Sequence, residues 1–224
     1  MIKSKEWNWQ VLDENEKKIW LEPSIPSFYL IERWKKLKKK TFLDLGCGLG
    51  RHTVLFSANK YKTYGFDLSS DGINKTRKYL EQENLKASLK VGDMLTLPYH
   101  DEMFDCILCY NVISHTDTQG VKKIIKELER VLKDNGEIYL TLCSKNTWGF
   151  KQADWPMVDE NTRIRMDDGP EKGIPHFYAD YDLIKELFHN FELIFVNEIK
   201  DYYEKNGKTN TSSHYHLLLK KTLH

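Results

Sequence analysis

A glycine-rich turn between an expected strand and an expected helix constrains the fold of this chain more than any other feature. The apolar segment TFLD ends at Asp44, and Gly46, Gly48 and Gly50 then alternate before a helical segment begins at Arg51. Glycine lets the backbone turn sharply and lets a ligand approach without meeting a Cβ atom. The free N–H groups of the following helix would face such a ligand. We therefore expect a ligand site where the first strand meets its helix.

Short apolar runs alternate with segments of helical periodicity between residues 41 and 143. This alternation predicts a parallel sheet with helices on both faces, the doubly wound α/β class. The turn KDNG, with Asn135 and Gly136, is expected to end the last of these helices. The expected strands are 41–46, 62–68, 87–93, 104–110 and 137–143, and the expected helices are 51–60, 70–84 and 121–133.

The alternation stops after the fifth expected strand. Residues 144–178 are rich in Trp, Pro, Gly and Asp and too long for an ordinary connection, so we expect them to shape a substrate pocket. A helix and two strands follow, and the polar link between these strands predicts that they pair antiparallel. Their expected bounds are 178–190 for the helix, 191–199 and 213–221 for the strands, and 206–213 for the link.

Residues 1–38 are expected to form a helical extension to one domain over 39–224. They hold two expected helices, separated by the segment EPSIPS. A lid that covers the ligand and excludes water is expected from four aromatic residues: Trp7, Trp9, Phe28 and Tyr29. Core packing is the alternative, because a second set recurs near helical spacing: Trp20, Tyr29, Trp34 and Leu37.

The spacing of the glycines discriminates between ligands. The dinucleotide fingerprint is G-x-G-x-x-G, whereas here Arg51 directly follows Gly50. The phosphate-binding loop requires G-x-x-x-x-G-K-[ST], whose lysine this turn lacks. The sequence D-L-G-C-G-L-G instead resembles the first motif of class I S-adenosylmethionine-dependent methyltransferases of the small-molecule type. The resemblance covers residues 40–143 well and the last two strands at the level of the fold.

This resemblance implies S-adenosylmethionine as the cofactor and a Rossmann-like sheet of about seven strands with the last strand antiparallel. It also implies that Asp67 accepts hydrogen bonds from both ribose hydroxyls and that Asp93 accepts the adenine amino group. Taken singly, these two acids would more often be turn or capping residues. The cofactor-binding residues expected from the resemblance are Asp44, Gly46, Cys47, Gly48, Gly50, Arg51, Asp67, Leu68, Asp93, Met94, Tyr110 and Asn111.

Methyl transfer itself needs little catalytic apparatus, because the sulfonium methyl is already activated and the protein mainly desolvates and aligns. A base is required only if the acceptor must lose a proton. His115 and His176 are the candidate bases, and a solvated or capping role is the alternative for each. The residues expected to line the substrate pocket are Trp148, Trp155, Phe177 and Tyr178.

No metal site is expected from the sequence. Cys106 and Cys109 form a C-x-x-C pattern, but residues three apart on a strand point to opposite faces, so we interpret them as buried thiols. His214 and His216 share one face of the last expected strand and are interpreted as rim residues.

The acceptor is expected to be a small molecule. The formal net charge is +1, and Y-N-V-I-S-H stands after the fourth strand where amino-methyltransferases of nucleic acids carry [DNS]-P-P-[YFW], so a nucleic-acid substrate is not expected. The sequence leaves open a sensor or partner subunit without catalysis, and a nucleic-acid or protein methyltransferase. A nicotinamide-dependent oxidoreductase is a further alternative, which the glycine spacing opposes.

The chain has no apolar run near the ~18 residues of a membrane span, and its first residues lack the apolar core of a signal peptide. We therefore expect a cytoplasmic protein without a membrane partner. A monomer or a homodimer is expected.

Overall fold

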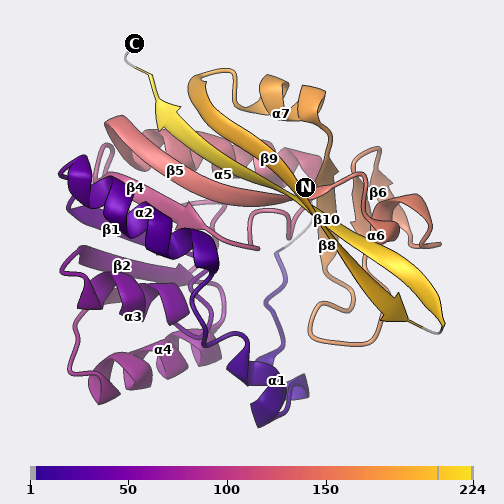
Figure 1. Cartoon of the computed structure of the whole chain (residues 1–224), viewed down its shortest axis with the longest axis horizontal. Helices are drawn as coiled ribbons and strands as arrows, with labels where there is room; N and C mark the ends of the chain where they lie inside the picture. The colour runs from indigo at the N-terminus through magenta and orange to yellow at the C-terminus, as the bar shows by residue number, and fades with distance from the viewer. Residues whose placement is uncertain (1–3, 206, 223–224) are drawn as a thin grey trace.

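A central sheet runs through the computed structural model, which describes residues 4–205 and 207–222 (Figure 1). Seven strands of this ten-stranded sheet follow the order β3-β2-β1-β4-β5-β10-β9, and among these seven only β10 runs antiparallel to the others. This order confirms the doubly wound sheet predicted from the sequence. The bounds are β1 Thr41–Leu45, β2 Lys62–Asp67, β3 Ser88–Val91, β4 Phe104–Cys109, β5 Leu132–Ser144, β9 Phe191–Lys205 and β10 Lys208–Lys221.

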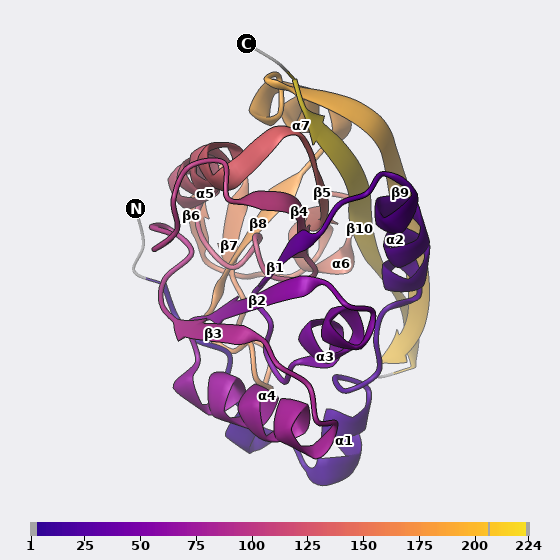
Figure 2. The ribbon, with the colours of Figure 1, turned by 90° about the vertical axis from the view of Figure 1, so that its left-hand side faces the viewer.

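Helices cover both faces of this sheet (Figure 2). Residues from α2 and α3 pack on one face, and residues from α5 and α7 pack on the other. The helix α4 lies beside α3 along the edge formed by β2 and β3. The helix bounds are α2 Ile25–Lys36, α3 Arg51–Ala58, α4 Ser70–Gln82, α5 Thr118–Val131 and α7 Tyr181–Leu187.

Side chains of the strand β4 alternate between the two core clusters on opposite faces of the sheet. Cys106 and Leu108 are buried with the helices α2 and α3, whereas Ile107 and Cys109 are buried with α5 and α7. The two cysteines therefore belong to opposite faces, as predicted, and both are free thiols. Burial of this strand on both faces explains why its sequence is almost uninterruptedly apolar.

A buried acid on β5 holds the helix α2 against the sheet. Both carboxylate oxygens of Glu137 accept hydrogen bonds from the Arg33 guanidinium, at 2.8 and 2.9 Å, and Trp34 Nε1 donates to the same carboxylate at 2.8 Å. Glu137 is buried, so the removal of one partner would leave a charge uncompensated, which typically costs about 3–5 kcal/mol. This contact fixes the N-terminal part of the chain to the domain.

Two helices precede the sheet, as predicted, with a short 3-10 turn, η1 (Trp9–Val11), before them. The first helix, α1 (Glu14–Lys18), begins with a capping box in which Asp13 accepts the backbone N–H of Glu16 and the Glu16 carboxylate accepts that of Asp13. A proline within the first turn of α2 suits a helix start, because that position needs no N–H donor. Residues 1–3 of the expected extension lie outside the described residues.

The expected turn at KDNG is wrong. The helix α5 ends at Val131, and β5 begins immediately at Leu132, so these four residues belong to the strand. The pairing of β4 with β5 shifts register between Phe104 and Cys106, and Asn135 takes a φ of 56° inside this irregularity. Four residues of β5, from Lys133 to Gly136, stand opposite the single residue Asp105 of β4, so the turn-forming residues lie in an irregular start of the strand and not at a helix end.

The long segment 144–178 contains regular structure rather than loop alone. It forms a short helix, α6 (Trp148–Lys151), and an antiparallel set of three strands, of which β8 also pairs with the end of β5. These strands are β6 Met157–Asp159, β7 Thr162–Ile164 and β8 Pro175–Ala179.

The last two strands pair antiparallel, as expected, but their hairpin is tighter than the sequence suggested. Residues 208–213 of the expected polar link pair with β9, starting from Lys208 opposite Lys205. Asn206 lies outside the described residues. Within the part of the chain that the structure describes, no helix has the length and apolar character needed to cross a membrane.

Candidate cofactor and acceptor site

A hollow lies at the carboxyl ends of β1, β2, β3 and β4, the edge at which open α/β sheets bind ligands. It encloses about 880 Å³ of empty space, a volume that includes space open to solvent. We call it the first hollow. Ten of the predicted cofactor residues line it: Gly46, Cys47, Gly48, Arg51, Asp67, Leu68, Asp93, Met94, Tyr110 and Asn111.

The glycine turn between β1 and α3 adopts a backbone that other residues rarely take. Gly46, Gly48 and Gly50 have φ angles of 73°, 53° and 91°. A Cβ at Gly46 would lie 2.3 Å from the Val112 side chain, and a Cβ at Gly48 would lie 2.9 Å from the Trp9 ring. Glycine is therefore required both by the backbone and by close neighbours.

The turn is braced against β2 by its own amides. Gly46 and Cys47 donate to the Phe66 carbonyl at 2.7 and 3.1 Å, and Gly48 donates to Asp67 Oδ2 at 2.8 Å. These three N–H groups of the turn face the protein and are not free for a ligand. What the turn offers a ligand is bare backbone at close range.

Asp67 stands at the end of β2 and links the turn to the next helix. Its Oδ2 accepts the Gly48 amide, and its Oδ1 accepts the Ser69 amide at 2.8 Å. Each carboxylate oxygen has two acceptor positions, so one position on each remains for a pair of hydroxyls. Burial raises the pKa of the Asp67 carboxyl, while backbone hydrogen bonds from Ser69, Gly48 and Leu68 oppose that shift. The arrangement fits an acceptor of two vicinal hydroxyl groups.

Two predicted cofactor residues do not line the first hollow. Asp44 is buried beneath the turn, where Thr53 Oγ1 donates to it at 2.7 Å, and burial raises the pKa of its carboxyl to about 7. Gly50 begins α3 and faces Thr76, which lies 2.8 Å from where a Cβ would be. Both residues support the turn, and neither contributes a contact surface to the hollow.

Asp93 follows β3, as the sequence predicts, and its Oδ1 accepts the Leu95 amide at 2.9 Å. This is the local capping role that the sequence left as an alternative. The remaining acceptor positions of the carboxylate lie at the rim of the first hollow with Leu68 and Met94 as neighbours in its lining. The position thus suits both a turn contact and a ligand contact.

The N-terminal segment closes over the first hollow through a tryptophan cluster. The ring of Trp7 stacks on Trp9 at 5.4 Å and meets Trp20 edge-on at 4.9 Å. All three rings line the first hollow. Phe28 and Tyr29, also expected to cover the ligand, are instead 52% and 51% exposed on α2 and do not belong to this lining.

Arg51 ties this cluster to the glycine turn. Its guanidinium donates to the carbonyls of Ile19 and Glu22, both at 3.3 Å, and lies over the rings of Trp20 and Tyr110 at 5.3 and 5.5 Å. The side chain therefore positions the N-terminal segment over the first hollow in addition to lining it.

A second hollow adjoins the first, and Asn111 and His115 line both. Asn111 has a φ of 57°, and its amide and side chain both bond to Thr141 Oγ1, which holds this junction in a fixed conformation. Of the residues predicted to line a substrate pocket, Trp148, Trp155 and Tyr178 line the second hollow, together with His176.

Phe177 is the exception among the predicted pocket residues. It is fully buried in the core beside α5 and α7, whereas His176 and Tyr178 border the second hollow. Because β8 alternates its side chains between two faces, three consecutive residues cannot all point into one cavity. The prediction failed because 175–179 form a strand where a loop was expected.

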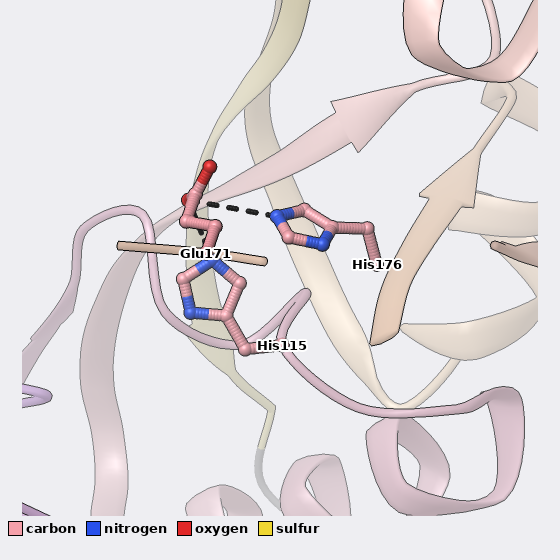
Figure 3. Close-up of side chains that lie close together, drawn as sticks. All are labelled: His115, Glu171 and His176. Atoms are coloured by element: carbon pink, nitrogen blue, oxygen red, sulfur yellow. Dashed lines mark ion pairs between the residues drawn. The ribbon is translucent and has the colours of Figure 1, made fainter. Parts of the chain in front are cut away.

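Three polar side chains converge in the second hollow (Figure 3). Glu171 Oε1 lies 3.3 Å from His115 Nε2 and 3.5 Å from His176 Nε2, and the two imidazole rings are 4.9 Å apart. Burial and the nearby Arg165 cation lower the pKa of His115 to about 4, so its imidazole is neutral at pH 7. Sequence analysis missed Glu171, since it lies in a connection of no recognisable pattern between β7 and β8.

Comparisons with known proteins agree with this geometry. Residues 42–136 match the family model described as a methyltransferase domain. A solved S-adenosylmethionine-dependent methyltransferase from Methanosarcina mazei superposes with a TM-score of 0.69 at 23% identity, covering 83% of this chain and 93% of that one. At this identity the likeness establishes the shared fold.

Two curated relatives share part of the sequence. An ajmaline N-methyltransferase from Rauvolfia serpentina is 34% identical over 107 residues, 46% of this chain and 36% of that protein. A ubiquinone biosynthesis O-methyltransferase from Coxiella burnetii is 26% identical over 116 residues, 52% of this chain and 49% of that protein. The chain thus matches half or less of the length of these relatives.

The sheet order and the glycine turn define an α/β protein with a hollow at its strand ends. The chain shares the fold of a solved S-adenosylmethionine-dependent methyltransferase, and its residues 42–136 are similar to a methyltransferase domain.

Proposed function

We propose that this protein binds S-adenosylmethionine in the first hollow and transfers its methyl group to a small-molecule acceptor in the second. The observation that supports this most is the junction of the two hollows at Asn111 and His115. A donor and an acceptor held in these hollows would meet there, and proximity of this kind can lower a barrier by several kcal/mol.

The residues of the first hollow suit each part of the cofactor. Asp67 has acceptor positions for two ribose hydroxyls, and Asp93 with Leu68 and Met94 offers an acid and apolar walls for an adenine ring. Tyr110 and Asn111 border the remaining space toward the second hollow. When bound, S-adenosylmethionine supplies a methyl group on a positively charged sulfur.

The protein's own contribution is to exclude water and to align the two molecules. Trp7 and Trp20 border both hollows, so the N-terminal segment covers the place where transfer would occur. Exclusion of water there strengthens each polar contact in the site. His115 and His176 are neutral imidazoles in the second hollow, and we propose that one of them receives a proton if the acceptor must lose one.

The acceptor class follows from the second hollow and from the relatives. Its walls include Trp148, Trp155 and Tyr178, which suit a flat or amphiphilic molecule. One of the two curated relatives is named an ajmaline N-methyltransferase, and the other is named a ubiquinone biosynthesis O-methyltransferase. Ajmaline and ubiquinone are small organic compounds. An extended polymer substrate has no such support.

Incubation of the purified protein with labelled S-adenosylmethionine and an extract of small metabolites tests this proposal. We expect S-adenosylhomocysteine to form and label to enter a small organic product. Cofactor binding without turnover across a broad extract would instead support the alternative of a sensor or partner subunit. Label in protein or nucleic acid would refute the small-molecule acceptor.

A further inference from the structure

The three side chains that converge in the second hollow are arranged as ligands of a cation (Figure 3). His115, Glu171 and His176 each offer one atom, and these atoms all lie within 4.8 Å of one another. Glu171 Oε1 lies close to both imidazoles, 3.3 Å from His115 Nε2 and 3.5 Å from His176 Nε2. The residues come from the loop after β4, the connection between β7 and β8, and β8 itself.

The protonation of His176 makes this arrangement unusual. Its Nδ1 lies 3.0 Å from the Ile174 carbonyl oxygen, which can only accept, so Nδ1 carries the proton of the neutral ring. The lone pair of Nε2 then points toward the Glu171 carboxylate, which is also an acceptor. Nε2 is buried and has no hydrogen-bond partner within the described part of the chain. Two acceptors therefore face each other without a donor between them.

The Glu171 carboxylate is held in a fixed direction. Arg165 donates to the other oxygen of Glu171 and so leaves Oε1 aimed at the two imidazoles. A cation between the three groups would satisfy all of them.

Two of the three separations between the ligand atoms agree with first-row transition-metal coordination, and the third is within 4.8 Å. Bonds of about 2.0–2.1 Å to imidazole nitrogen and about 2.0–2.2 Å to carboxylate oxygen place tetrahedral ligand atoms about 3.3 Å apart. The two contacts to Glu171 Oε1, at 3.3 and 3.5 Å, match this separation. We propose that His115, Glu171 and His176 form a binding site for a divalent transition-metal ion such as Zn²⁺ or Fe²⁺.

The surroundings are those of a metal site with open positions. The Ile174 carbonyl fixes the ring of His176, and Arg165 orients Glu171, as outer partners of metal ligands commonly do. All three ligands line the second hollow, so further positions on the ion would face a bound acceptor. Two imidazoles and one carboxylate favour Zn²⁺, Fe²⁺ or a similar ion over the oxygen-seeking Mg²⁺ and Ca²⁺.

The site stands independently of methyl transfer, but it would deepen the proposed function if both hold. A metal ion lowers the pKa of a hydroxyl or water bound to it. Because His115 lines both hollows, an acceptor oxygen on the ion would lie near the junction at which transfer is proposed. His115 and His176 would then act as ligands, and the acceptor's own proton would leave more readily.

Calorimetry of the untagged, chelator-treated full-length protein tests the site directly. We expect one Zn²⁺ per chain and no comparable binding of Mg²⁺. Glu171→Gln and His176→Ala should each raise the Kd for Zn²⁺ by about 100-fold or more, since even outer-shell changes cost about 10–100-fold. His100→Ala removes an exposed imidazole outside both hollows and should leave the Kd unchanged.

Parallel titration with S-adenosylhomocysteine and circular dichroism separate the possible outcomes. Lost Zn²⁺ affinity with retained fold and S-adenosylhomocysteine affinity in Glu171→Gln supports the site. A wild-type protein that binds S-adenosylhomocysteine but not Zn²⁺ overturns it, as does Zn²⁺ binding that all variants share. Zn²⁺ binding that depends on Glu171, without S-adenosylhomocysteine binding, supports the metal site and refutes the proposed function.

Discussion

The two hollows of this protein are built from different kinds of sequence. The first takes its residues from the ends of neighbouring parallel strands, so its lining follows short motifs such as D-L-G-C-G-L-G and G-F-D-L. The second takes its residues from the N-terminal segment, the loop after β4, the insertion 144–178 and the strands β5, β9 and β10. The strand ends supply much of the first hollow and the N-terminal tryptophans cover it, whereas the second hollow needs segments from the whole chain.

This contrast carries a functional expectation. The first hollow should keep its ligand when the insertion 144–178 is altered, because the first and second hollows share few residues. The second hollow should tolerate changes in size and polarity that redirect the acceptor. The following predictions separate the contributions of the two hollows to cofactor affinity, stability and turnover.

The largest effect on cofactor affinity is expected from Gly48→Val. The φ of 53° strains any β-branched residue, and the new Cβ would lie 2.9 Å from Trp9 in the first hollow. We expect S-adenosylhomocysteine affinity to fall by more than about 100-fold, which is about 2.7 kcal/mol, in a calorimetric titration.

The matched control for this variant is Gly207→Val. Gly207 has a φ of 68° in the β9–β10 hairpin and nothing within 4 Å of an added Cβ, so it carries similar backbone strain away from the site. Equal loss of affinity in the two variants would mean that general destabilisation, not the close approach at Gly48, causes the effect.

A smaller loss is expected from Asp67→Ala. This variant removes the acceptor proposed for two ribose hydroxyls and also frees the Gly48 amide, which now donates to Oδ2 at 2.8 Å. The expected cost to S-adenosylhomocysteine binding is ~1–3 kcal/mol, measured by calorimetry. Asp67→Asn should retain part of the affinity, because its amide oxygen still accepts. Unchanged affinity in both variants would contradict the assigned role of Asp67.

A stability effect of about 1 kcal/mol or more is expected from Asp44→Asn, and its size depends on pH. The folded protein raises the pKa of this carboxyl from 3.8 to about 7, so the folded state binds more protons than the unfolded state between these values. Stability from this group therefore decreases as the pH rises from about 4 to about 7, by ~1.4 kcal/mol for each unit of pKa difference.

Chemical denaturation at pH 5 and pH 8 measures this dependence. Asn cannot ionise, so the free energy of unfolding of Asp44→Asn minus that of wild type should be larger at pH 8 than at pH 5, which means that the variant gains stability relative to wild type as the pH rises. The opposite trend would show that the Asp44 carboxylate is stabilised as an anion in the folded protein.

The smallest effect on cofactor affinity is expected from Trp155→Ala. Trp155 lines only the second hollow, where its ring meets Trp148 edge-on at 5.6 Å. S-adenosylhomocysteine affinity should stay within about twofold of wild type, a change below ~0.5 kcal/mol, while turnover with a responsive metabolite extract falls. A large loss of S-adenosylhomocysteine affinity would remove the distinction between the two hollows.

The sequence predicted most of the fold because periodicity and local turns govern it. The parallel strands, their helices and the opposite burial of Cys106 and Cys109 follow from the period of the apolar residues, and the antiparallel last pair follows from the polar link between its strands. The prediction at KDNG was wrong because the same residues that end a helix also suit an irregular strand start, and only pairing with β4 decides between them.

The site was predictable only where it is local. Asp67 and Gly48 stand at strand ends that motifs identify, and both line the first hollow. Phe177 was assigned to a pocket because no periodic signal marked β8 as a strand within the insertion. Glu171 joins His115 across 56 positions of sequence, and nothing local to either residue indicates that the fold unites them.

Calorimetric titration of S-adenosylhomocysteine into the purified protein, with NADH as the comparison, tests the central claim most directly. We predict that one molecule of S-adenosylhomocysteine binds per chain, that NADH does not compete with it, and that Gly48→Val abolishes the heat signal. A protein that ignores S-adenosylhomocysteine at millimolar concentration, or that prefers NADH, would contradict the cofactor assignment on which the proposed transfer depends.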